Sequence, residues 1–265
     1  SGNRALYHDG WMARTIHRAP WEREPTRTLE EDVWELYNVE GDFSLTTNLA
    51  AEHPEKLAEL QALFLKEAEK YHVLPMDDRM LERANASLVN RPDLMAGRTS
   101  LSLAEGMTGM MENVFINVKN KSKVITAEVE VGEGDANGTL IAQGGRFGGW
   151  SLYVKDGMPA YDYNFLGLTR NTIIAENPLP TGKSTIRFEF DYDGGGVGKG
   201  GKGTLYVNDE MVAEGQIEHT QPMIFSADET ADVGIDLGTP VVEAIGAEAA
   251  SRFTGRIPSL TVEVK

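Results

Sequence analysis

A glycine-rich run, GGGVGKGGKGT at residues 194–204, is the first stretch whose residue types and spacing could do chemistry. Gly196, Gly201 and Lys202 have the spacing of the G-x-x-x-x-G-K phosphate-binding loop. The next residue is Gly203 rather than Ser or Thr, so the usual magnesium ligand is missing. The pattern after the run predicts a strand, so no helix N-terminus would face a phosphate. The run is therefore predicted to be a flexible hairpin loop.

Two groups of carboxylates could hold a hard cation such as Ca²⁺. Asp77 and Asp78 are adjacent, but Arg79 follows them, which favours a solvated or ion-paired pair. Three aspartates near the C-terminus could join backbone carbonyls in a calcium site: Asp228, Asp232 and Asp236. No ligand loop of fixed spacing contains those three. We therefore assign no metal-binding and no cofactor-binding residue.

The histidines show no pattern of a catalytic or metal site. They are His8, His17, His53, His72 and His219, and no two have the helical spacing of metal ligands. His8 beside Asp9 could be a general base oriented by a carboxylate, but a strand end at a tight turn is the favoured interpretation. No oriented Ser-His-Asp set is recognisable. No catalytic residue is assigned.

Aromatic side chains could stack on sugars if they were exposed. The candidates are Trp150, Tyr153, Tyr161 and Tyr163. Most of them are expected in the core, so a glycan site built on them is the less favoured alternative.

The four aromatic candidates lie in the stretch Thr139–Asn164, whose pattern predicts strands. Trp150, Leu152 and Val154 alternate with polar or amphipathic residues, and period-two alternation predicts a strand with one buried face. Asp156-Gly157 suits a two-residue turn, because both positions need positive φ. The stretch is predicted to contain a β-hairpin with those three apolar residues in the core.

From about residue 100 to residue 265 the same pattern recurs. It predicts roughly ten short strands, and hence a jelly-roll-like antiparallel β-sandwich of two sheets. The expected strands include 114–118, 124–131, 186–190, 205–207 and 260–264. Residues 241–252 are compatible with a short helix or a loop.

Residues 1–80 are predicted to form a small α+β subdomain. Asp9-Gly10 joins two expected strands, Val33–Val39 is a third, and Pro54–Tyr71 has the apolar spacing of an amphipathic helix. Residues 81–99 are expected to be a connector between this subdomain and the sandwich at 100–265. The fold class is therefore mainly β, with a sandwich preceded by a short antiparallel sheet and one helix.

Composition excludes several classes of function. The net charge of −16 argues against nucleic acid or an anionic membrane as a partner. The chain has no Cys, so disulfides and thiolate chemistry are excluded. We expect a soluble protein, cytoplasmic or periplasmic, with the compartment undetermined. Because the chain opens on Ser1 directly before an expected strand, we also expect a fragment of a longer protein.

Several segments together resemble the C-terminal portion of formylglycine-dependent arylsulfatases. The segments are GNRALYHDGW at 2–11, WELYNV at 34–39, TNLAAEHPE at 47–55 and YHVLPMDDR at 71–79. Asn38 stands where those enzymes usually have Asp. The stretch GTLIAQGGRFGG at 138–149 and the residues after it are similar to the sandwich tail of the same enzymes, in the style of laminin-G and concanavalin-A-like domains.

The resemblance implies that the intact parent is a sulfate-ester hydrolase that uses formylglycine and calcium. Its nucleophile comes from a Cys/Ser-x-Pro-x-Arg motif, and in this chain the nearest pattern has Arg23 at the nucleophile position of Arg23–Arg27. The chain would then be a non-catalytic C-terminal fragment, inactive alone and without a cofactor of its own. Its expected partner is the missing N-terminal catalytic domain, which the hairpin at His8 and Trp11 would contact, and further copies of the chain are a second candidate. The alternative functions are a carbohydrate-binding, lectin-like module and a structural or oligomerisation domain.

Overall fold

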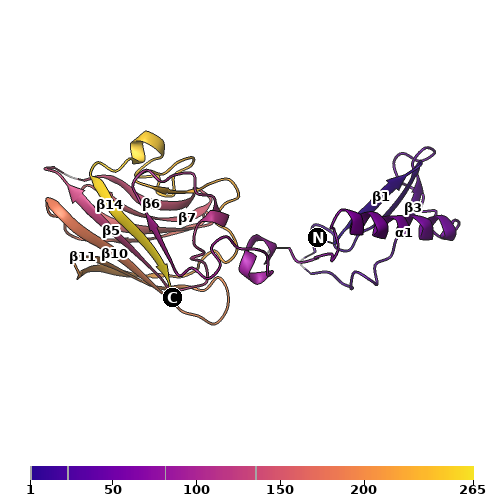
Figure 1. The fold of residues 1–265 in the computed structure, drawn as a ribbon, viewed down its shortest axis with the longest axis horizontal. Helices are drawn as coiled ribbons and strands as arrows, with labels where there is room; N and C mark the ends of the chain where they lie inside the picture. Colours follow the sequence, from indigo (N-terminus) through magenta and orange to yellow (C-terminus); the bar gives the residue numbers. More distant parts are fainter. Residues whose placement is uncertain (1, 23, 81, 135) are drawn as a thin grey trace. The chain divides into compact units, whose positions relative to one another are not determined.

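The protein is described from a computed structural model, in which the chain forms two compact units, Ser1–Arg83 and Ala84–Lys265 (Figure 1). The structure describes residues 2–22, 24–80, 82–134 and 136–265. Ser1 and Arg23, which entered the expectations about the start of the chain and the sulfatase motif, lie outside the described residues.

The N-terminal unit is a three-stranded antiparallel sheet with one helix. Its elements are β1 (Arg4–His8), β2 (Trp11–Thr15), β3 (Glu35–Asn38) and α1 (Pro54–Lys70). Asp9 and Gly10 have φ values of 47° and 79°, the left-handed conformation that a tight two-residue turn between β1 and β2 requires. Ala13, Leu36 and Leu60 form the buried centre between sheet and helix. The expected small α+β arrangement is confirmed.

The C-terminal unit is an antiparallel sandwich of two sheets, drawn as two layers in Figure 1. The six-stranded sheet has the order β12-β11-β10-β5-β14-β4: Glu210–Ile217, Gly201–Val207, Gly182–Tyr192, Lys123–Val131, Arg256–Val264 and Ser100–Leu103. The five-stranded sheet has the order β13-β6-β7-β8-β9: Ala231–Val233, Gly138–Gly145, Gly148–Lys155, Met158–Phe165 and Thr169–Ile174. The mainly β fold class is confirmed.

Strand alternation fills the space between the two sheets. One row across the five-stranded sheet consists of Val233, Ile141, Leu152, Tyr161 and Ile173, and all five are buried in the main core. Ile186, Phe188 and Phe190 of β10 face them from the other sheet and are also buried. The expected hairpin turn is present, with φ of 51° at Asp156 and 80° at Gly157.

Two local expectations need correction or completion. Residues 114–118 do not form a strand: a 3₁₀ turn, η3 (Glu112–Val114), is followed by irregular chain. The apolar residues of this stretch are explained because the irregular segment buries Phe115, Ile116 and Val118 in the core. Residues 241–252 are a loop that ends in the 3₁₀ turn η4 (Glu248–Ser251). Two further 3₁₀ turns, η1 (Glu82–Ala84) and η2 (Ala86–Leu88), lie between α1 and β4.

Among the described residues, no helix combines the length and the apolar character that crossing a bilayer requires. The α-helix α1 has 17 residues and carries charged side chains near both of its ends.

Candidate functional site

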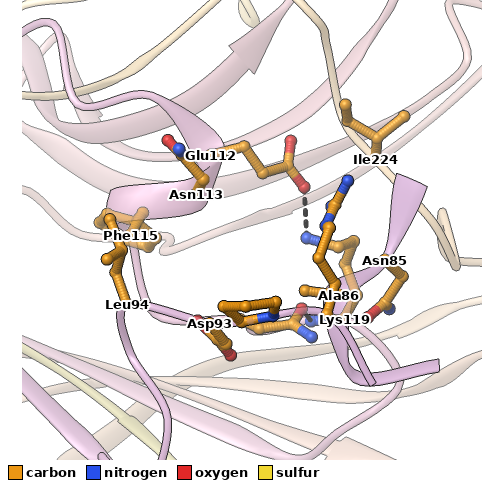
Figure 2. Close-up of a pocket in the computed structure, with 12 residues that line it drawn as sticks. Asn85, Ala86, Asp93, Leu94, Glu112, Asn113, Phe115, Lys119 and Ile224 are labelled. Atoms are coloured by element: carbon orange, nitrogen blue, oxygen red, sulfur yellow. Dashed lines mark hydrogen bonds and ion pairs between the residues drawn. The ribbon is translucent and has the colours of Figure 1, made fainter. Parts of the chain in front are cut away.

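A pocket of about 460 Å³ lies in the C-terminal unit, beside the segment that leads into β5. Figure 2 shows side chains from several stretches of chain around it, with Phe115 and Leu94 on one side and Asn85 on another. Its lining comes from residues 85–94, from residues 112–119 and from Ile224. The volume lies within the range of roughly 300–1,000 Å³ that small-molecule sites occupy.

An ion pair holds one wall of the pocket in place. The Lys119 Nζ donates to Glu112 Oε1, drawn as a dashed line in Figure 2, and both side chains are largely buried, at 4% and 18% exposure. The second oxygen, Glu112 Oε2, accepts the backbone N–H of Phe225 at 3.0 Å. Because both carboxylate oxygens are engaged, the Glu112 side chain is a rigid acceptor rather than a free base.

Asparagine amides fix the other parts of the wall. Asn85 and Asn120 both donate to the Pro222 carbonyl, at 3.3 and 2.8 Å, and so join three loops. Asn117 Oδ1 accepts the backbone N–H of Lys119 at 3.1 Å. Asn113 is exposed on η3 and lines the pocket. These bonds preorganise the lining before any ligand arrives.

The lining can bind but carries no recognisable catalytic set. Its polar groups are three asparagine amides, the carboxylates of Asp93 and Glu112, and the cations of Arg91 and Lys119. Phe115, Leu94, Pro92 and Ile224 supply apolar surface. No Ser, Cys, His or Tyr belongs to the described lining, so it offers no such nucleophile or imidazole base. Donors and acceptors beside apolar surface suit a ligand with both hydroxyl groups and hydrophobic faces.

A buried lysine lies deeper in the sandwich. Lys123 of β5 is 3% exposed, and its Nζ lies 4.9 to 5.9 Å from the ring centroids of four aromatic side chains: Trp150, Tyr161, Tyr163 and Phe190. Burial, and secondarily repulsion from Lys119, lowers its pKa from 10.5 to about 7. The sequence did not mark Lys123, because the four rings come from three other strands.

The aromatic residues considered for sugar stacking are core residues. Trp150, Tyr153, Tyr161 and Tyr163 are at most 4% exposed. Trp150 Nε1 donates to Gln143 Oε1 at 3.1 Å, and Tyr163 Oη accepts the backbone N–H of Gln221 at 2.7 Å. The favoured interpretation, that most belong to the core, is confirmed, and none of them can stack on a bound sugar in this structure.

The three C-terminal aspartates do not converge on an ion site. Asp228 is exposed and bonds Ser226. Asp232 accepts the Gly109 N–H at 2.7 Å and the Thr230 hydroxyl at 3.0 Å, while Asp236 accepts the Val241 N–H at 2.9 Å. Within the described residues, no cluster of three or more His, Cys, Asp or Glu side chains has the arrangement to hold a metal ion.

The other sequence candidates have local roles. Lys202 lies exposed on β11 and pairs with Glu214 at 2.7 Å, after a loop rich in positive-φ glycines. Asp77 pairs with Arg79 at 2.9 Å, as expected. His8 ends β1, lies 3.3 Å from Asp9 and is 45% exposed, which agrees with a strand end at a turn.

The N-terminal unit contains a buried histidine network that the sequence patterns did not indicate. His17 is 1% exposed in its side chain, its Nδ1 lies 3.0 Å from both Asp32 oxygens, and its Nε2 lies 3.3 Å from Asp78. Arg4 also bonds Asp32. The partners are 15 and 61 residues away in sequence, so no short motif marks them.

A second hollow of about 570 Å³ lies in the same unit and is open to solvent. It is lined by residues 25–31 and Asp78. Its wall combines one cation, Arg27, with the carboxylates of Glu30, Glu31 and Asp78. Asp78 belongs to the His17 network, and Arg27 pairs with Asp32 of that network at 3.7 Å, so the groups of this hollow are engaged in the ion pairs of the fold.

No protein-family model and no curated protein sequence matches this chain. Several solved structures are similar in fold. The Ruminococcus gnavus IT-sialidase CBM40 bound to α2,3-sialyllactose matches with a TM-score of 0.41 and 15% identity, over 63% of this chain and 89% of that one. The K499G mutant of the Streptococcus pneumoniae NanB sialidase matches with 0.43 and 12%, over 62% and 25%. The heptameric SAP-like pentraxin of Limulus polyphemus matches with 0.37 and 15%, over 63% and 78%.

These comparisons contradict the resemblance to arylsulfatases. The reported structural neighbours are sialidase modules, sialidases and a pentraxin, and no sulfatase is among them. The sulfatase and hydrolase expectations that followed from the resemblance are therefore withdrawn, while the expected partner domain is not tested by these structures. The short segments that carried it consist of strands β1, β3 and β6 with their turns, the start of α1 and the chain after it. Alternation, turn and capping requirements restrict the residue types there.

Proposed function

We propose that the C-terminal unit is a carbohydrate-binding, lectin-like module and that its ligand occupies the pocket beside η3. The observation that supports this proposal is the lining itself: amides, a fixed carboxylate and two cations stand beside the apolar surface of Phe115 and Leu94. Sugars present hydroxyl groups at their edges and C–H groups on their faces. The pocket has both polar and apolar groups in its wall, and its volume of about 460 Å³ leaves room for a small saccharide.

The charges favour binding over turnover. Glu112 is held by Lys119 and by the Phe225 N–H, so its carboxylate acts as a fixed acceptor. Asp93 Oδ1 accepts the Met95 N–H at 2.8 Å. A glycosidase needs a carboxylic acid and a carboxylate on opposite sides of a scissile bond, each free to exchange a proton. Because both oxygens of Glu112 are engaged, the pocket offers at most one such free carboxylate, Asp93, and not the pair.

A glycan array with the full chain, in the presence and absence of calcium, tests the proposal. Sialyllactose belongs in the panel because it is the ligand bound to the Ruminococcus gnavus module. Asn113→Ala removes an exposed pocket amide, and Asn177→Ala removes an exposed amide outside the pocket. Loss of one hydrogen bond, about 1 kcal/mol, should weaken binding roughly fivefold in the first variant and leave the second unchanged.

Two results would contradict the proposal. The first is no binding to any glycan under either condition, which would favour a structural domain. The second is binding that Asn113→Ala and Asn177→Ala reduce equally, which would place the ligand elsewhere.

A further inference from the structure

The outer face of the five-stranded sheet carries a row of mainly polar side chains. Strand register aligns them in the order Asp232, Ala142, Ser151, Asp162 and Thr172, one from each strand. The neighbouring row, from Val233 to Ile173, belongs to the main core. Since side chains alternate between the two faces of a sheet, the polar row must point away from that core.

A loop covers this outer face. We call residues 238–246 the strap. Val241 and Val242 of the strap form a small apolar cluster with Ala142, Tyr153 and Ala160 of the sheet. Beneath it, Ser151 is fully buried and Asp162 is 4% exposed, although both belong to the outward row. The strap therefore excludes water from a polar surface.

Hydrogen bonds to Thr239 and Val241, in the first half of the strap, hold it to its surroundings. Glu229 accepts the Thr239 N–H at 3.2 Å and its hydroxyl at 2.6 Å. Asp236 accepts the Val241 N–H at 2.9 Å, and Arg170 of β9 donates to the Val241 carbonyl. Its terminal residues, Gly238 and Gly246, have φ of 71° and 83°, where larger residues are strained.

The covered state leaves two acceptors unsatisfied. Within the described part of the chain, Asp162 Oδ1 and Asp236 Oδ1 are buried and have no hydrogen-bond partner, and both residues are more than nine-tenths buried. A buried acceptor without a partner keeps its desolvation cost uncompensated. A hydroxyl group of a ligand could donate a hydrogen bond to Asp162 of this row, whereas the apolar side chains of Val241 and Val242 in the strap cannot.

The charges make the strap sensitive to pH. Burial raises the pKa of Asp236 from 3.8 to about 7, with Asp232 and Glu229 adding repulsion, and burial also raises the pKa of Asp162. The charged groups on the surrounding elements are Arg146, Asp162, Arg170, Glu229, Asp232, Glu243 and Glu248. Five of these seven are acidic, so on balance they oppose ionisation of Asp236 in the closed state.

The direction of the pH effect follows from the raised pKa. Asp236 is protonated in the closed strap below pH 7, and a carboxyl released into water would ionise near 3.8. The closed state is therefore most favoured at pH 4 and loses its advantage as the pH rises to 7. The equilibrium for opening should rise by roughly three hundredfold over that interval.

We propose that the strap is displaceable and that the polar face beneath it is a second binding site, for a glycan segment whose hydroxyl groups bond Ser151, Asp162 and Thr172. This site is separate from the pocket beside η3, and its occupancy is coupled to opening of the strap. Below about pH 5 the strap shields the face, and at neutral pH the face becomes accessible.

Hydrogen–deuterium exchange of the full chain tests the first half of the proposal. Exchange of strap amides, corrected for the intrinsic rate at each pH, should rise between pH 5 and pH 8 in the wild type. Asp236→Asn should remove most of that rise, because its amide does not ionise. Strap protection that is independent of pH in the wild type, or unchanged pH dependence in Asp236→Asn, would overturn the pH coupling.

Binding in an Asn113→Ala background tests the second half, because the pocket should bind about fivefold more weakly there and a gain that follows loosening of the strap would come from this face. Val241→Ser should loosen the strap, raise its exchange and raise glycan affinity at pH 5 by tenfold or more. Ala244→Ser, an exposed change in the same strap, should alter neither. Faster strap exchange without any gain in glycan binding would overturn the ligand assignment, and unchanged exchange would overturn the displaceable strap. Failure of the pocket proposal would show instead as undiminished binding in Asn113→Ala itself.

Discussion

Replacing Lys123 with methionine tests the energetics of the sandwich core most directly. The lysine is 3% exposed among four aromatic rings, and its pKa falls from 10.5 to about 7. A methionine has a similar length and no charge, so it can fill the same space. The change therefore removes a buried titratable group with little change in volume.

The magnitude follows from the two pKa values. Because the folded chain binds this proton less tightly than the unfolded chain, the free energy of unfolding rises with pH between about 7 and 10.5. Linkage gives a destabilisation by the lysine of about 4 kcal/mol at pH 7 and about 1 kcal/mol at pH 10. Lys123→Met should remove this difference of about 3 kcal/mol, so that its advantage over the wild type is greatest at neutral pH. Loss of cation–π attraction, about 0.5–2 kcal/mol, reduces the gain but affects mainly the charged form.

Guanidinium denaturation followed by tryptophan fluorescence measures the free energy of unfolding of both proteins at pH 7 and at pH 10. Trp150 lies among the rings around Lys123 and reports on this part of the core. Lys183→Met, an exposed lysine of the same sheet with 84% of its side chain exposed, is the matched control and should show no such pH dependence relative to the wild type. A Lys123→Met variant that is less stable than the wild type at both pH values by the same amount would refute the reasoning. It would mean that the rings stabilise the ammonium more than burial penalises it.

Two further predictions concern other parts of the chain. His17→Ala removes the imidazole between two carboxylates and should destabilise the N-terminal unit by about 2–4 kcal/mol in thermal unfolding, whereas His8→Ala at its exposed turn should change stability by less than about 0.5 kcal/mol. Equal effects of the two changes would contradict a structural role of the buried network. Gly144→Ala places a Cβ 2.2 Å from the Gly148 carbonyl at a φ of 87° and should destabilise the sandwich by more than about 2 kcal/mol, while Gly41→Ala meets no atom within 4 Å. Matching unfolding midpoints for those two variants would show that the β6–β7 turn is not constrained as described.

Strands and turns could be predicted from the sequence wherever the residues that determine them are close along the chain. Alternation of Trp150, Leu152 and Val154 predicted a strand and its buried face, since a period of two depends only on neighbouring residues. Asp156-Gly157 predicted the turn, because positive φ is a property of the residues themselves. The prediction of a strand failed at 114–118, where a short apolar run belongs to irregular chain that enters the core.

Functional assignment from short matching segments failed for a related reason. The resemblance to sulfatases rested on short strands, turns and a helix start, whose residue types follow local rules, and the reported neighbours of the fold are sialidase modules and a pentraxin. Fold similarity does not specify function, which depends on sites that individual side chains build. The glycan-binding alternative therefore depends on the pocket and the strap-covered face rather than on any motif.

The sequence by itself determined the strands, the tight turns, the amphipathic helix and the absence of cysteine chemistry, because each depends on residue type and local spacing. Only the tertiary structure decided the sites. The pocket brings Asn85, Glu112 and Ile224 together. The aromatic rings around Lys123 of β5 come from β7, β8 and β10. The strap brings Val241 against Ala142. These contacts span tens to more than a hundred residues, and sheet pairing and packing, rather than local preference, bring their members together.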